Sequence, residues 1–219
     1  IGLLGDGIII EAQEGNIVIN NATFSDNLSN SVMILTTGDS TWLSECSFEQ
    51  NKGNRAIRIE FGPLVTVRNL FMGNDFANHK NSSGAIYLGS STQFTGENIT
   101  FNEKKLFFVA TSGNNNFQPI KIKNCILNKT QMLDSTNGSI TSLNLTLTHS
   151  ALYNTAFTCA DLPPGTCGPG MIEGIEPMFV NPDSGDFRLQ PCSPLVNAGD
   201  NALVSPGNVT DLAGNARIA

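Results

Sequence analysis

The sequence has few charged residues, few aromatic residues and no long hydrophobic run. Charged residues make up 14% of the 219-residue chain, against about a quarter in an average globular protein, and only 12 residues are Lys or Arg. With a net charge of −7, the chain lacks the clustered basic residues that nucleic-acid binding requires. It also lacks the run of about 18 apolar residues that would span a bilayer. The sequence therefore predicts no nucleic-acid partner and no direct membrane insertion.

Neutral polar residues supply the missing polarity, since the chain contains 26 Asn residues. Hydrophobic residues still make up 40% of the chain and are spread evenly, so the composition favours a folded protein over a disordered one. The first ten residues contain neither an initiator Met nor the basic start of a signal peptide. We therefore expect the numbering to begin inside a mature or trimmed product.

Six short apolar runs recur along the first two thirds of the chain. Their final apolar residues are Phe24, Phe48, Met72, Phe101, Leu127 and Leu152. These residues are separated by 24, 24, 29, 26 and 25 positions, and a nearly constant period of this size is typical of a solenoid. We expect the six residues to form one continuous buried column.

Each run alternates with period two, which indicates a strand because successive side chains of a strand point to opposite faces. Two inward columns are expected. The first is Ile17, Thr41, Val65, Phe94, Ile120 and Leu145, and the second is Ile19, Leu43, Val67, Gly96, Ile122 and Leu147. In each run the second inward residue is followed by a position that is mostly an amide residue. This position suits a bend, since Asn tolerates the left-handed conformation. This bend column is Asn21, Glu45, Asn69, Asn98, Asn124 and His149.

A second short strand precedes several of these runs, and clusters of Gly, Asn and Ser separate the two. Strands repeating every 24–29 residues describe an all-β parallel β-helix, in which one chain winds into stacked coils. A β-sandwich would need hairpin signals about every 8–12 residues and would give no columns. The repeat ends near residue 156, so we expect coils over residues 1–156 and an irregular closing segment of the same domain over 157–219.

The closing segment carries the most specific motif of the chain. It contains Phe179-Val-Asn-Pro182, Gly185-Asp-Phe-Arg-Leu-Gln-Pro191, Asn197-Ala-Gly-Asp200 and Thr210-Asp-Leu-Ala-Gly-Asn-Ala-Arg-Ile218. Residues 175–218 resemble the last coil of secreted bacterial right-handed parallel β-helix repeat surface proteins. One departure is Glu176, where that family usually has Asp. The resemblance implies a single-stranded, pectate-lyase-like right-handed β-helix that belongs to a larger extracellular surface protein.

The five cysteines divide into two groups. Cys46 and Cys125 fall in one column three coils apart, roughly 14 Å at the usual strand spacing and too far for a disulfide. We therefore expect both to be free and buried. In the closing segment a Pro-Pro-Gly turn favours a Cys159–Cys167 disulfide, and Cys192 remains an alternative partner for either. A disulfide would suit an oxidising exterior.

Candidate functional residues are few. Arg58 and Tyr87 occupy equivalent outward positions on adjacent coils, with Glu60 beside them and Phe108 next in line. This group could stack on a sugar ring, whereas ordinary surface filling is the simpler alternative. The sequence shows no catalytic residues, no metal site and no cofactor site, because no coil carries the clustered carboxylates of a lyase or hydrolase.

Two functions from different classes remain. The first is a structural or adhesive extracellular module, a β-helical rod section that binds a glycan or another surface polymer weakly. The alternative is a polysaccharide lyase or glycoside hydrolase of the β-helix type that acts on an acidic polysaccharide. Convergence of three or more ionisable side chains in one groove would favour the enzyme.

Overall fold

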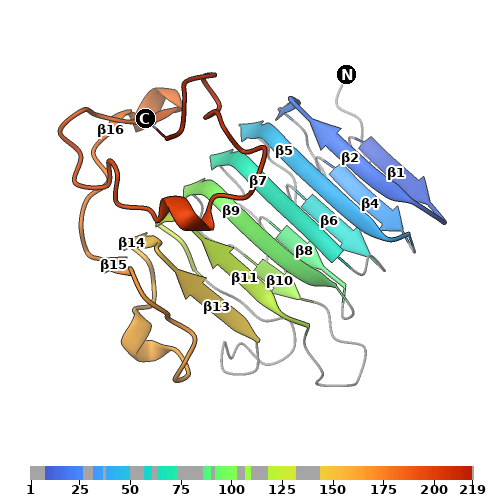
Figure 1. Ribbon diagram of the computed structural model, residues 1–219, viewed down its shortest axis with the longest axis horizontal. Helices are drawn as coiled ribbons and strands as arrows, with labels where there is room; N and C mark the ends of the chain where they lie inside the picture. The colour runs from blue at the N-terminus through green and yellow to red at the C-terminus, as the bar shows by residue number, and fades with distance from the viewer. Residues whose placement is uncertain are drawn as a thin grey trace.

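The fold is an all-β parallel solenoid, described by a computed structural model (Figure 1). The structure describes residues 8–26, 32–36, 38–49, 57–60, 64–73, 86–89, 92–102, 107–109, 118–131 and 144–218. The predicted fold class is therefore confirmed: short strands from successive coils stack in parallel. None of the described helices is long or apolar enough to cross a bilayer.

One sheet carries the short strands that precede each long run. In the described residues it contains, in spatial order, β1 (Ile8–Ala12), β4 (Val32–Thr36), β6 (Ile57–Glu60), β8 (Ile86–Leu88) and β10 (Phe107–Val109). All four of its neighbouring pairs are parallel.

A larger sheet carries the runs identified in the sequence. Its strands are β2 (Asn16–Asn20), β3 (Thr23–Ser25), β5 (Ser40–Glu49), β7 (Leu64–Gly73), β9 (Gln93–Asn102), β11 (Ile120–Lys123), β12 (Ile126–Asn128), β13 (Leu145–Thr148), β14 (Ala151–Tyr153) and β15 (Ile172–Glu173). Because β15 pairs in parallel with β14, the coil stacking continues beyond residue 156.

The predicted core column is confirmed. The register pairs Phe24 with Phe48, and the pairing continues through Met72 and Phe101 to the two leucines. All six residues are at most 7% exposed, and the rings of Phe24 and Phe48 stack with centroids 4.8 Å apart. Stacking identical positions of successive coils thus builds one apolar interior.

The two inward columns are confirmed as well. The strand register aligns Ile17, Thr41, Val65, Phe94, Ile120 and Leu145. In the second column Gly96 contributes no side chain. A Cβ atom at this position would lie 3.0 Å from Ile99 Cδ1 and 3.1 Å from Phe94 Cε1. The large neighbouring side chains therefore occupy the room that a side chain at this position would need.

The rest of the closing segment has little regular structure. It contains the 3₁₀ turns η3 (Cys159–Asp161), η4 (Pro182–Ser184) and η5 (Asn201–Leu203), and the antiparallel pair β16 (Phe179–Asn181) and β17 (Asp186–Leu189). Gly185 at φ 84° closes the turn between β16 and β17, in the left-handed conformation that glycine adopts without strain. In Figure 1 the final red stretch runs back over the ends of the central strands.

Candidate functional site

The predicted sugar-binding residues lie in one column of the five-stranded sheet. The register pairs Arg58 with Tyr87 and Tyr87 with Phe108. The guanidinium carbon of Arg58 lies 5.5 Å from the centroid of the Tyr87 ring, within the range of a cation–π contact. Glu60 ends strand β6, two positions beyond Arg58, and the side chains of Glu60 and Phe108 lie outside the described part of the structure.

The bend column has the predicted left-handed backbone. Its six members, Asn21, Glu45, Asn69, Asn98, Asn124 and His149, have φ values between 46° and 54°. Asn21, Asn124 and His149 lie between two strands of the larger sheet, whereas Glu45, Asn69 and Asn98 lie within the long strands β5, β7 and β9. The strand register aligns the six positions along the solenoid axis. Two of the amides, those of Asn69 and Asn124, bind the closing segment rather than each other.

Residues 200–217, here called the strap, cross this column coil by coil. At the first crossing the Asn124 side chain receives a hydrogen bond from Asp200 N and donates one to Asp200 O, both at 2.9 Å. Lys123 Nζ donates to Leu203 O at 2.6 Å. At the last crossing the Asn69 amide donates to Thr210 O at 2.7 Å and accepts from the guanidinium of Arg217.

Glu97 anchors the middle of the strap. Its carboxylate accepts hydrogen bonds from Ser205 N at 2.6 Å, Ser205 Oγ at 2.5 Å and Asn208 Nδ2 at 3.0 Å. Lys123 Nζ lies 3.3 Å and Arg68 Nε 3.8 Å from the same carboxylate, on neighbouring coils. The strap covers Glu97 so completely that its side chain has no exposed surface.

The surroundings of Glu97 keep its carboxylate ionised. Burial alone would raise its pKa, but the hydrogen bonds from Ser205 and Asn208 and the charge of Lys123 outweigh burial and lower it. The pKa of Arg217 shifts for a related reason, since burial lowers it while the charges of Asp211 and Glu97 oppose the shift. The Glu97 carboxylate and the Arg217 guanidinium thus hold the strap at two separate coils.

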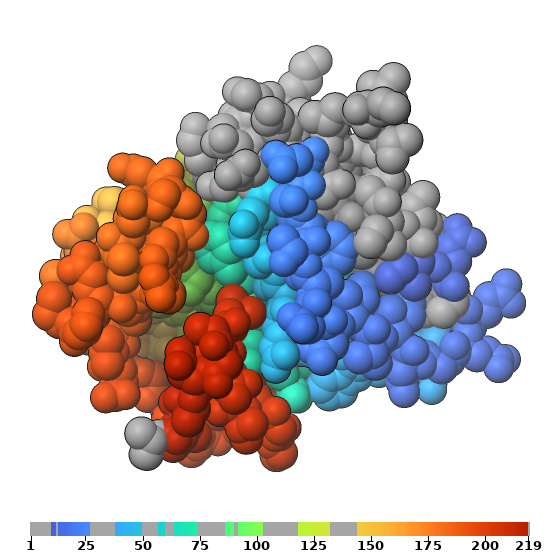
Figure 2. Space-filling view, turned by 90° about the horizontal axis from the view of Figure 1, so that it is seen from above, coloured from blue at the N-terminus to red at the C-terminus, as the bar shows by residue number. Residues whose placement is uncertain are grey.

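Two adjoining cavities separate the bends from the closing segment. The larger has a volume of about 460 Å³ and the smaller about 280 Å³, and both are lined by Asn98, Thr100, Phe187 and Arg217. In the space-filling view the hollow lies between the orange and red parts of the closing segment and the blue and cyan coils (Figure 2). We call the two cavities together the trench.

Two carboxylates of the trench, those of Asp186 and Asp211, have lowered pKa values, whereas a general acid needs a raised pKa. The Arg188 guanidinium, bonded to Asp186 at 2.6 and 2.9 Å, lowers the pKa of that carboxyl to about 2. For Asp211 burial would raise the pKa, but hydrogen bonds from Asn215 and from Ala213 N lower it overall. Among the described residues no group of His, Cys, Asp and Glu could hold a metal ion.

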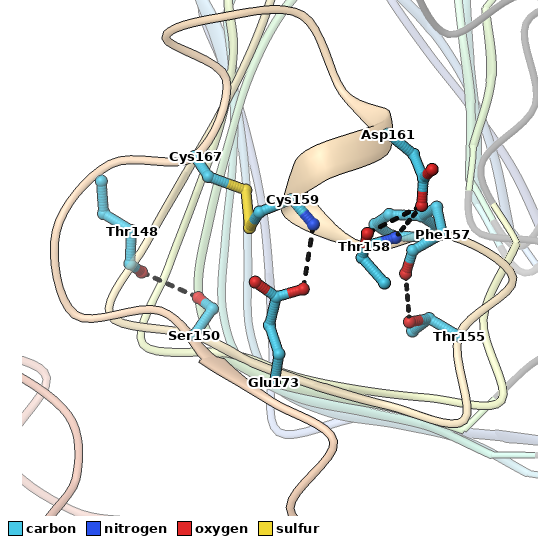
Figure 3. The surroundings of a disulfide bond; sticks show 9 residues. All are labelled: Thr148, Ser150, Thr155, Phe157, Thr158, Cys159, Asp161, Cys167 and Glu173. Atoms are coloured by element: carbon cyan, nitrogen blue, oxygen red, sulfur yellow. Dashed lines mark hydrogen bonds between the residues drawn. A yellow bond between two sulfur atoms is a disulfide. The ribbon is translucent and has the colours of Figure 1, made fainter.

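The predicted cysteine pairing is confirmed. Cys159 and Cys167 form a disulfide with Cα atoms 5.8 Å apart (Figure 3). Cys46, Cys125 and Cys192 are free. Glu173 accepts a hydrogen bond from Cys159 N at 2.9 Å and so ties this loop to strand β15. Burial raises the pKa of the Cys125 thiol to about 12, which makes that thiol unreactive.

The strand register aligns Arg68, Glu97 and Lys123 in one outward column on successive coils, but sequence reasoning missed their role. A carboxylate between two basic residues on successive coils was the available signal, and nothing in the repeat showed that a segment more than 100 residues later would cover it.

The fold and site thus define a parallel β-solenoid whose closing segment is held by buried charges. Comparisons with protein-family models, curated proteins and solved structures find no match.

Proposed function

We propose that the chain is a structural or adhesive extracellular module, a solenoid section of a larger surface protein that binds a glycan weakly. The observation that carries this proposal is the column on the five-stranded sheet, where the Arg58 guanidinium lies over the Tyr87 ring on the adjacent strand. A ring with a polar end suits ligands that are apolar on one face and hydroxylated at the edge. Aromatic and Arg side chains are also enriched where proteins bind partners.

The remaining chemistry supports an extracellular setting. The Cys159–Cys167 disulfide is the kind of bond that persists in oxidising compartments. The parallel stacking of strands gives the solenoid a stiff axis along which further coils could be added. This stiffness suits a rod that carries a binding surface away from a cell.

The alternative is a β-helical lyase or hydrolase, and the trench gives it a specific location. The larger cavity meets the criterion given above in favour of an enzyme, because six ionisable side chains line it: Glu45, Glu49, Asp186, Arg188, Asp211 and Arg217. A lyase needs a base to take the C5 proton of a uronate and a cation to neutralise its carboxylate. Asp186 is paired with Arg188 and Asp211 is bonded within its own turn, so two of the four carboxylates are already engaged.

Glycan-array binding and a turnover assay together test the proposal. We expect weak binding that Tyr87→Ala and Arg58→Ala abolish and that Tyr153→Ala, which removes the other tyrosine of the chain, leaves unchanged. We also expect no release of unsaturated uronate from alginate, pectate or chondroitin, with or without Ca²⁺. Turnover by the wild type that is lost in Arg58→Ala or Tyr87→Phe would contradict the proposal of an adhesive module and would support the enzyme instead.

A further inference from the structure

The two ends of the coil stack differ. In Figure 1 β1 and β2 stand at one end of the stack, and β14 and β15 stand at the other. The chain closes this second end itself, because the loop after η3 pairs with β13: Leu147 N donates to Thr166 O at 2.8 Å and Gly168 N donates to Leu147 O at 2.7 Å. Phe157 and Leu162, both at most 7% exposed, belong to the core here. Solenoids need such a cap at each end to stay soluble.

The first coil, residues 8–25, carries the opposite edge of both sheets. In the described part of the structure β1 pairs only with β4, and β2 and β3 pair only with β5. Proteins usually protect an exposed edge strand with Lys, Pro or a bulge. The sequences of β1 (IIIEA) and β2 (NIVIN) contain neither Lys nor Pro and are rich in Ile and Val. Such an edge favours pairing with a further strand.

The apolar columns are less well buried in the first coil than in the coils that follow. Ile19 is half-buried, whereas Leu43 and Val67 in the same column are at most 1% exposed. Ala22 is half-buried as well, and Cys46, at its position in the second coil, has no exposed surface. A coil stacked one strand spacing away, at ~4.8 Å, would bury these residues as the later coils bury their neighbours.

Polar side chains on the outer face of β2 already bond to the second coil. Ser40 Oγ donates to Asn16 Oδ1 at 2.6 Å, and Ser44 Oγ donates to Asn20 Oδ1 at 3.0 Å. Because both Oδ1 atoms face the second coil, the Nδ2 groups of Asn16 and Asn20 are directed away from it. Acceptors on a preceding coil would continue both rows of hydrogen bonds.

Charge argues against a second copy of the chain as the partner. Residues 1–49 contain seven Asp and Glu residues and no Lys or Arg. Glu11, on β1, and Glu14, just after it, are both exposed. Two copies joined through this end would bring these carboxylates together, and like charges repel. The other end of a second copy is closed by its own loop, so it offers no edge for this one.

We propose that the first coil is an interface for a further parallel coil, stacked on β1, β2 and β3 in the register that joins the first and second coils. This inference rests on the proposed function, because the larger surface protein supplies that coil. Apolar residues of the added coil lie over Ile10, Ile19 and Ala22, and its polar residues accept hydrogen bonds from Asn16 and Asn20. Coils are therefore added to this section at one end only.

Duplication of one coil within the full chain tests the proposal. Residues 32–56 span one repeat, since Val32 pairs with Ile57, and a copy of them is inserted directly before Ile8. Amide hydrogen exchange in β1 and β2 should then become slower than in the wild type by about tenfold or more, while exchange in β7 stays unchanged. The matched control is the same insertion with Ile34→Asp and Leu43→Asp in the copy. These two positions fall over Ile10 and Ile19, so the control should not slow the exchange.

The wild type supplies a second measurement that does not depend on the inserted coil. It should sediment as a monomer, and the amides of β1 and β2 should exchange faster than those of β7. A wild-type dimer with protected β1 and β2 would make a second copy the partner and overturn the proposal. A monomer in which these strands are as protected as β7 would show that this end is already closed. Equal exchange in the insertion variant and its control would show that the added coil does not stack.

Glycan binding by the same proteins separates this proposal from the proposed function. Tyr87→Ala should abolish glycan binding and leave exchange in β1 and β2 unchanged, because Tyr87 lies on β8. An insertion variant with slowed exchange but no glycan binding would contradict the adhesive role and leave the interface in place.

Discussion

The coils and the closing segment are stabilised in different ways. In the coils each strand pairs with the same position one repeat away, and the apolar columns bury one residue per coil at almost no exposure. The strap has no such repeat and is held by single polar contacts, above all those of Glu97. The stability of the coils is thus shared among many equivalent residues, whereas the attachment of the strap depends on a few.

Removing one ring from the core should produce the largest effect. Phe48 has no exposed surface and stacks on Phe24, so Phe48→Ala should lower the free energy of unfolding by about 3–5 kcal/mol. Denaturant unfolding measures this loss. Leu212→Ala in the strap is the control, because Leu212 is 49% exposed and should change stability by less than about 0.5 kcal/mol. Similar losses in the two variants would mean that the column does not form the core.

Removing the charge of Glu97 should loosen the strap and leave the coils folded. Glu97→Gln keeps the size of the side chain but weakens its bonds to Ser205 and Lys123, at a cost of about 1–3 kcal/mol. Limited proteolysis should then cut within residues 200–217 faster than in the wild type. Glu49→Gln removes a carboxylate from the same sheet without touching the strap and should not change the cutting rate. Faster cutting in the coils instead would show that the strap and coils unfold together.

Acid should act on the strap through the same carboxylate. Because the pKa of Glu97 is lowered on folding, its ionised form stabilises the strap at pH values above 4.5, the ordinary pKa of a glutamate. This contribution is lost as the pH falls through the lowered pKa. The protection factors for amide hydrogen exchange at Ser205 and Asn208 should therefore fall at acid pH in the wild type and depend less on pH in Glu97→Gln. An identical pH profile in both proteins would mean that another group controls the strap.

The same contrast explains what could be predicted from the sequence. The apolar columns, the left-handed bends and the column shared by Cys46 and Cys125 were predictable because each position recurs about every 24–29 residues. An irregular residue in one repeat therefore does not hide a pattern that the other repeats show. The position of the strap was not predictable, because each of its contacts occurs only once and joins residues far apart in the sequence, such as Asn69 and Arg217, which are separated by 148 positions. Apolar periodicity predicts which face is buried, but it does not show which polar residue a distant segment will cover.

The smallest effect concerns the three free thiols, which also differ between the two regions. Cys46 and Cys125 are buried in the coils, and burial raises the pKa of both thiols, whereas Cys192 is exposed in the closing segment. Alkylation of the native protein should therefore label one thiol, and alkylation under denaturing, non-reducing conditions should label three.

Cys192→Ser should abolish the native label and change the free energy of unfolding by less than about 0.5 kcal/mol, because its side chain lies at the surface. The denatured variant should then yield two labelled thiols, those of the coil column. Mass spectrometry after tryptic digestion assigns each label. A native label on Cys125 would mean that the coils open locally on the timescale of the reaction. A single label in the denatured wild type would reveal a second disulfide and would contradict the assignment of Cys46 and Cys125 as free thiols.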